Sequence, residues 1–149
     1  MTIPQKVQQA FVSWLKSQHP LADIPQANIY HGIQHEEDDN SDTTIQLPCV
    51  ICNCDAAEPI AQFSGNRRAT AVIEVHSNAD DSTQEEHQDR VQAVTEKLLT
   101  DTIAANLSTA LEQFTVFLVV PSADGWRVDG RSWVSSLQLL IDCAPSDIL

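Results

Sequence analysis

The chain has 149 residues and a mass of 16.4 kDa, which is the size of a single domain. It holds 21 acidic and 8 basic residues, for a formal net charge of −13. Binding to nucleic acid or to anionic membranes needs a basic surface, so this charge argues against both functions. Because 42% of the residues are hydrophobic, the chain can still form a core, and we expect a strongly acidic globular domain.

The apolar runs of the sequence are too short or too interrupted to predict a signal peptide or a membrane-spanning helix. Polar residues interrupt the first 19 positions. No apolar run approaches the roughly 20 residues that a membrane-spanning helix needs. We therefore expect the four cysteines to be reduced in a cytosol, where a thiol behaves as a small hydrophobic group.

The N-terminal part predicts one helix followed by a loop. The segment Thr2–Gln5 has the spacing of a capping box, and Pro4 suits a first turn because its missing N–H has no helical partner there. Apolar residues then recur at helical spacing until Pro20 ends the pattern: Val7, Ala10, Phe11, Trp14 and Leu15. Residues 21–33 predict a loop with a short extended piece at 28–30.

An acidic segment at 35–42 follows this loop. Five of its eight residues are acidic, and like charges at this density repel one another and cannot join a core. We therefore expect an exposed loop that carries Glu36, Glu37, Asp38, Asp39 and Asp42.

Two strands and two helices are predicted next. Residues 44–55 alternate as in a strand, with a break or an edge position at Pro48, and 69–77 form a second strand after turn residues at 64–68. The spacing of Ser82 and Glu85 is that of a capping box and opens a helix. Its expected buried stripe is His87, Val91, Val94 and Leu98, and a shorter helical piece follows at 102–111.

The C-terminal part predicts further strands. Residues 114–120 form a continuous apolar run of strand length, 121–125 predict a turn, and Asp129-Gly130 predicts a hairpin before a last strand at 132–143. The order of elements predicts an α+β fold in one domain spanning 1–149. We expect a single mixed, largely antiparallel sheet with helices packed on one face.

A family resemblance rests on a succession of elements along the chain. These are the N-terminal helix, the acidic loop, the strand at 44–54, a Gly-containing turn, the strand RRATAVIEVHSNADD, the capped helix STQEEHQDRVQAVTEKLL and the strands around GWRVDGRSWVSSLQLLID. In this order the chain resembles the tail-terminator proteins of long-tailed bacteriophages and related prophages, and more loosely their neck and tail-completion proteins. The resemblance covers roughly residues 4–143 and rests on element order and residue class.

The resemblance implies a structural role with no catalysis and no cofactor. Members of the family form a hexameric ring on the completed tail tube, stop its polymerisation and present the surface to which the head docks. The implied partners are further copies of the chain, the tail tube protein and a head-completion or neck protein. The implied location is the tail–neck junction of the virion, after assembly in the host bacterial cytoplasm.

A ring around DNA needs a lumen that does not hold phosphate, and an acidic lining lets the duplex pass without specific binding. A charge of −13 on each subunit also causes repulsion between neighbours, so we expect the few cations at contacts. Arginine and aromatic residues are enriched at interface centres. The candidate interface residues are Arg67, Arg68, Trp126, Arg127, Arg131 and Trp133. The alternative is that the arginines are solvated turn residues and the tryptophans cover the sheet.

Other chemistries have weaker support. Cys49, Cys52 and Cys54, with Cys143 far along the chain, have the count of a zinc site, but strand alternation places Cys49 opposite the other two. No helix follows Cys52, as a redox motif would need. A cytosolic cysteine-based metal-binding or redox domain therefore stays an alternative, and buried reduced thiols are favoured.

Several histidines lie near acidic residues. His31 precedes the acidic loop and His35 is its first residue, so these side chains and the carboxylates are candidates for binding a divalent cation. The loop lacks the ligand spacing of a calcium site. Glu74 and His76 share one face of a strand, and His87 lies in line with the apolar stripe of its helix. No arrangement meets the geometric needs of catalysis, so we expect no enzyme.

Overall fold

The computed structural model describes residues 2–32, 45–60, 65–111 and 114–145, so the acidic loop with Glu36, Glu37, Asp38, Asp39 and Asp42 lies outside the described residues. The elements in chain order are α1 (Ile3–Ser17), a 3-10 turn (Gln26–Asn28), β1 (Ile29–His31), β2 (Cys49–Pro59), β3 (Arg67–Asn78), α3 (Gln84–Leu98), α4 (Ile103–Ala110), β4 (Phe114–Asp129) and β5 (Ser132–Pro145). No helix in these ranges is long and apolar enough to cross a membrane.

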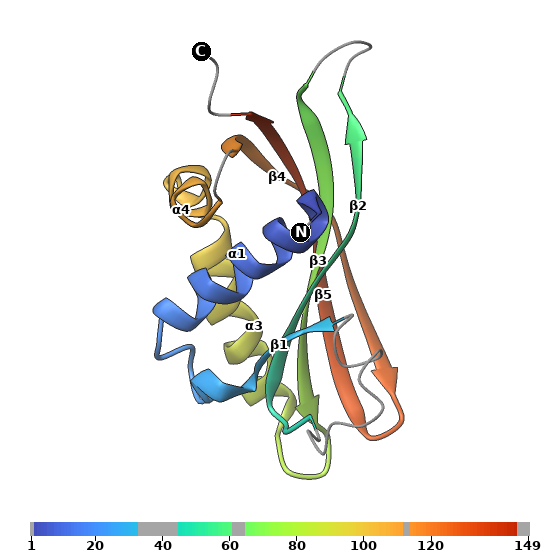
Figure 1. Cartoon of the computed structure of the whole chain (residues 1–149). Coiled ribbons are helices and arrows are strands. Elements are labelled where there is room, and N and C mark those ends of the chain that lie inside the picture. Colours follow the sequence, from blue (N-terminus) through green and yellow to red (C-terminus); the bar gives the residue numbers. More distant parts are fainter. Residues whose placement is uncertain (1, 33–44, 61–64, 112–113, 146–149) are drawn as a thin grey trace, which may run out of the picture.

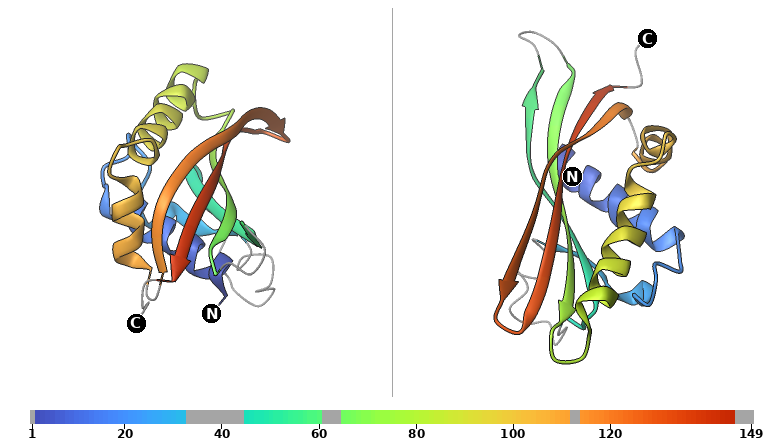
Figure 2. Two further views of the ribbon diagram at one scale, coloured as in Figure 1. Left: turned by 90° about the horizontal axis from the view of Figure 1, so that it is seen from above. Right: turned by 180° about the vertical axis from the view of Figure 1, so that it is seen from behind.

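The described strands form one five-stranded sheet in the order β1-β2-β3-β5-β4. The short β1 pairs parallel with β2, and every other pair is antiparallel. Helices α1, α3 and α4 lie on the same side of this twisted sheet (Figures 1 and 2). The predicted fold class, an α+β fold with a mixed and largely antiparallel sheet and helices on one face, is confirmed.

The core lies between the helices and the sheet. Strand β3 alternates between buried and half-buried positions, as a strand with only one covered face does. The residues that fill the core from the helices include Val7, Phe11 and Leu15 of α1, Val94 and Leu98 of α3, and Leu107 of α4. Full burial of side chains of this size stabilises a fold by roughly 1.5–3 kcal/mol each, so the amphipathic stripes hold the layers together.

Both long helices begin at capping boxes, one of them a residue later than predicted. The Thr2 hydroxyl accepts the N–H of Gln5 at the start of α1, as expected. At α3 the N-cap is Thr83 rather than Ser82, and its hydroxyl accepts the N–H of Glu86. Two hydroxyl residues in a row made both assignments compatible with the sequence.

Two predicted turns are strand instead. Arg67 and Arg68 begin β3 rather than ending a turn. Strand β4 continues through 121–125, where a turn was predicted, and a break in register between Pro121 and Ala123 absorbs the irregular residues. Proline is tolerated there because β4 lies at the edge of the sheet, where an N–H is not needed. The hairpin turn is confirmed, with Gly130 at a φ of 62°.

Candidate interaction surfaces

Arg68 is paired with a buried aspartate on the sheet face away from the helices. Its Nε and Nη2 donate to the two carboxylate oxygens of Asp142, at 2.7 and 3.0 Å, and these residues are direct partners in the β3–β5 register. The Asp142 carboxylate is buried, and a bidentate pair of this kind holds both side chains in one orientation. The neighbouring Arg67 donates to the carbonyl of Asn66. The predicted interface residue Arg68 is therefore held on the sheet surface by its pair with Asp142.

Arg127 also lies on this open face, in a cluster with two residues of β3. It donates to Oε2 of Glu74 at 2.9 Å, and His76 lies 3.2 Å from the other carboxylate oxygen. The hydrogen bond from His76, together with the bond and charge of Arg127, lowers the pKa of Glu74 to about 2. Glu74 and His76 share one face of β3, as predicted, and the structure adds a contact between them and with Arg127, which the sequence had grouped with the tryptophans.

The two tryptophans predicted at the interface, Trp126 and Trp133, lie on the helix side of the sheet, whereas Arg127 lies on the other side. Trp126 is a register partner of Ser135, whose hydroxyl contacts His87 of α3. Trp133 packs its ring against His87 at a centroid distance of 5.9 Å and is half-buried. Trp126 stays 60% exposed. Alternation along β4 thus separates Trp126 from its neighbour Arg127.

Arg131 lies in the β4–β5 turn, where it is 85% exposed and 3.4 Å from Asp80. The six predicted interface residues are therefore distributed over both faces and one end of the sheet. The structure brings the two tryptophans to one face, and Arg68 and Arg127 to the other.

A buried polar network, which the sequence did not predict, attaches α3 to the sheet. The ring nitrogens of His87 lie 2.7 Å from the Ser77 hydroxyl and 2.9 Å from the Ser135 hydroxyl. Burial, aided by the charge of Arg90, lowers the pKa of His87, so the ring is held neutral. Arg90 is buried in the same stripe and pairs with Asp23. The position of Arg90, three residues after His87, could have indicated that its side chain is buried on the same helix face. Its partner Asp23, however, lies 67 residues away in the sequence.

The cysteine positions agree with the alternation predicted for β2. Cys52 and Cys54 are in the core under the helices, and Cys49 is buried outside that core as the register partner of His76. Burial raises the pKa of Cys49 to about 12 and also raises that of Cys52. Within the described ranges, no three His, Cys, Asp or Glu residues form a group that could hold a metal ion.

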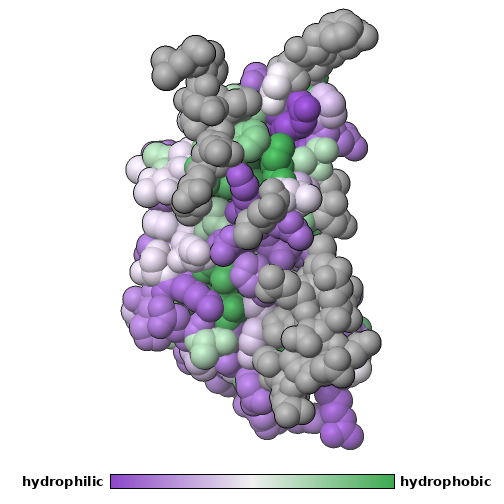
Figure 3. All heavy atoms as spheres, viewed as in Figure 1, coloured by the Kyte–Doolittle hydropathy of each residue, from purple (hydrophilic) through white to green (hydrophobic). Residues whose placement is uncertain are grey.

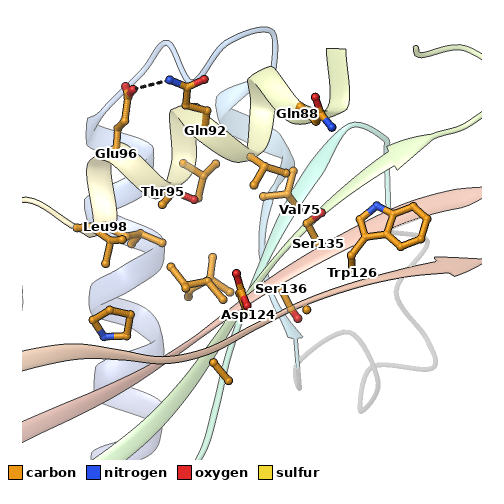
Figure 4. A pocket seen from close by; sticks show the side chains of 18 of the residues that line it. Val75, Gln88, Gln92, Thr95, Glu96, Leu98, Asp124, Trp126, Ser135 and Ser136 are labelled. Carbon is orange, nitrogen blue, oxygen red and sulfur yellow. Dashed lines mark hydrogen bonds between the residues drawn. The ribbon is translucent and has the colours of Figure 1, made fainter. Parts of the chain in front are cut away.

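A groove of about 1150 Å³ opens between α3 and the β4–β5 hairpin. Figure 4 shows Gln88 and Gln92 on α3 and Trp126 and Asp124 on β4, with Val75 and Ser135 from the strands between. Glu96 and Asp124 supply its charge, and no lysine or arginine is among its lining residues. The groove is thus an apolar and amide-rich surface with acidic borders.

Exposed apolar side chains are concentrated on the strand that borders this groove. Of eight large hydrophobic residues exposed in the described ranges, five belong to β4: Phe117, Leu118, Val120, Trp126 and Val128. By contrast, Figure 3 shows the opposite side of the molecule, where α1 lies, as mainly hydrophilic with small separate hydrophobic areas. Of these residues, Trp126 and Val128 lie on the groove side of β4, whereas Leu118 and Val120 are register partners of Asp142 and Leu140 and lie on the open face. The exposed Trp126 and Val128 therefore mark a candidate interaction surface beside the groove.

The comparisons with known proteins give a likeness in fold. No family model and no curated protein sequence matches the chain. A solved structure titled "Virion of native gene transfer agent (GTA) particle" contains a chain that is similar, with a TM-score of 0.63 and 13% sequence identity. The match covers 91% of this chain and 92% of that one, so the two share their fold over nearly their whole lengths.

Proposed function

We propose that the chain is a structural virion-assembly protein: a tail terminator that forms a ring, with six copies, on the end of a phage tail tube. The ring stops polymerisation of the tube and provides the surface to which the head docks. The observation that carries this proposal is the shared fold, over nearly the full length, with a chain of a gene transfer agent virion particle. That likeness supports a phage-type structural protein, and the order of elements in the sequence adds the terminator role.

The charge of the chain suits a ring through which DNA passes. With 21 acidic and 8 basic residues, each subunit repels the phosphate backbone, so a duplex in the lumen meets no salt-sensitive anchor. The described arginines on the open sheet face are neutralised by Asp142 and Glu74. These pairs support the proposal that DNA passes without specific binding.

The proposed partners are further copies of the chain, the tail tube protein and a head-completion or neck protein. The proposed location is the tail–neck junction of the virion, after assembly in the host bacterial cytoplasm. A neighbouring neck or head-completion role is supported by the same fold, and the test below separates the two. We propose no catalytic activity and no cofactor.

The rival class, a cysteine-based metal-binding or redox domain, has less support. A reactive thiol needs a lowered pKa and access to solvent. All four cysteines are buried, and burial raises the pKa of Cys49, Cys52 and Cys143. These thiols are suited to packing in the protein interior.

Deletion of the gene from its phage or prophage tests the proposal. A terminator role predicts tails of abnormal and variable length that lack heads, seen by electron microscopy of induced lysates. Tails of normal, uniform length without heads would assign the chain to the head-completion side of the neck instead. Complete particles in normal numbers would contradict both structural roles.

A further inference from the structure

We propose that the groove between α3 and β4 of one copy receives the outer face of α1 from a second copy. This interface rests on the ring of the proposed function and names the surfaces that build it. The groove face is defined by Gln88, Gln92, Glu96, Asp124, Trp126 and Val128, and the α1 face by Gln5, Gln9, Ser13 and Lys16.

The groove face has an apolar surface that water does not favour. Trp126 and Val128 are 60% and 55% exposed, and they project on the helix side of β4 beside the groove. Tryptophan is enriched among the few residues that account for most of the binding energy of an interface. Covering these side chains is therefore a strong source of affinity.

The sheet leaves one long edge without a partner strand. At the opposite edge, β1 covers the start of β2, and the Gln8 side chain accepts the N–H of Cys54 at 3.0 Å. In the described residues β4 pairs with β5 alone. On its outer edge, the Ser108 hydroxyl accepts the N–H of Val116 and donates to the Val116 carbonyl, at 2.8 and 3.1 Å. The bulges and Pro121 disfavour addition of another strand along β4, so packing of a helix suits this edge better.

Charge favours a second copy of α1 as the occupant. Helix α1 has two lysines and no acidic residue among its 15 positions, in a chain with 21 acids. Helix α3 bears four exposed acids, Glu85, Glu86, Asp89 and Glu96. The groove adds Asp124 and holds no lysine or arginine, and the neutral His87 contributes no positive charge. Of the long helices, α1 is thus the one that an acidic groove does not repel.

The two faces lie on opposite sides of the molecule. Figure 1 shows α1 in front of α3, and the view from behind in Figure 2 shows α3 and the β4–β5 hairpin nearest the viewer, with α1 beyond them. A contact between two different surfaces is heterologous, and it forms a ring when the repeated rotation between neighbours returns to the first subunit. Such an interface leaves both surfaces of every subunit occupied.

Two variants disable the two faces separately. Trp126→Asp places a charge in the apolar part of the groove. Its matched control is Ile60→Asp, which changes an exposed isoleucine directly after β2. Gln9→Glu/Ser13→Glu adds two acids one turn apart on α1. Its matched control, Ala105→Glu/Thr109→Glu, adds the same charges with the same spacing on exposed positions of α4. Circular dichroism and thermal unfolding establish that each variant is folded.

Oligomer mass is then measured by native mass spectrometry and light scattering, in solution and with purified tail tubes. Each interface variant alone is expected to be a monomer at a concentration where the wild type and both controls assemble. An equimolar mixture of Trp126→Asp and Gln9→Glu/Ser13→Glu is expected to form a heterodimer that does not grow, because one intact groove meets one intact α1 face.

Three results would overturn the interface. Rings formed by either interface variant at wild-type concentration would show that its face is not used. A mixture that stays monomeric would show that α1 is not the occupant of the groove. A wild type that stays monomeric even with tubes would remove the ring and, with it, the proposed function, whereas the first two results leave that function standing.

Discussion

The guanidinium of Arg90 lies 2.6 Å from each carboxylate oxygen of Asp23, so an arginine buried on α3 is neutralised by a residue of the loop after α1. The same guanidinium donates to the hydroxyls of Ser77 and Ser82 at 2.9 Å. One buried cation thereby connects the first loop, β3 and the start of α3. Loss of its anion leaves a charge without compensation in the protein interior.

Asp23→Asn is expected to lower the free energy of unfolding by about 1–3 kcal/mol at neutral pH. We expect a value near the lower end of this range because the Asp23 side chain is largely exposed to solvent. Arg90 lowers the pKa of Asp23 below its usual 3.8, so this stabilisation is present above that pH and is lost as the pH falls through the folded-state pKa. Urea unfolding from pH 7 to pH 3 measures the difference between wild type and variant. A difference that grows on acidification would contradict the pairing.

His87→Gln is expected to remove an acid sensitivity of the fold. The pKa of His87 is lowered from 6.5 by burial, so the unfolded chain binds a proton that the folded chain does not. Wild-type stability due to this residue is therefore full above about pH 6.5 and declines as the pH falls below it. The variant should be about 1–2 kcal/mol less stable at pH 7, through weaker bonds to the two serines. Its stability should depend less on pH between 7 and 5, and an equal dependence in both proteins would refute the assignment.

The four thiols are expected to resist modification in the folded protein. Each is buried, and the raised pKa of Cys49, about 12, leaves almost no thiolate at neutral pH. Ellman's reagent should therefore label no more than a trace of protein until urea unfolds it. Cys52→Ala should cost about 1 kcal/mol of stability and leave assembly unchanged. Rapid labelling in native buffer, or stoichiometric zinc in the purified protein, would favour the cysteine-based alternative.

Arg131→Glu is expected to weaken assembly while leaving the fold intact. The side chain is 85% exposed, and its ion pair with Asp80 spans 3.4 Å, so the pair contributes little to stability. Arg131 is one of the cations expected at subunit contacts, so reversal of its charge places an acid at the contact itself, where it faces a neighbour whose net charge is −13. Sedimentation at low and high salt measures the effect, which salt should reduce. Assembly equal to that of the wild type at low salt would exclude Arg131 from the contact.

Local chemistry was enough to predict most of the fold. The capping residue Thr2 and the apolar stripe from Val7 to Leu15 specified α1, and the alternation within 69–77 specified the central part of β3. Strand β4 was predicted only in part because Pro121 and Gly125 are turn formers in isolation. Their tolerance in a strand depends on β4 lying at the sheet edge, which is a property of the tertiary structure.

The candidate surface was harder to predict than the fold. Trp126 and Arg127 are adjacent in sequence, so they were expected in one patch, but neighbouring strand residues point to opposite faces. Arg127 is then neutralised by Glu74, a residue 53 positions earlier. The burial of Arg90 was not predicted for a similar reason. A cation can be buried only with a partner, and the partner Asp23 is distant in the sequence. Long-range pairing decides which cations are available for contacts.

The most direct test of the proposed function measures tail-tube growth. Purified tubes are incubated with the chain or with buffer, tube protein is added, and tube lengths are recorded by electron microscopy. A terminator predicts a ring-shaped cap at one end of each tube and no further growth from that end, at a ratio of one ring to each tube. Continued growth from both ends in the presence of a saturating excess of the chain would contradict it.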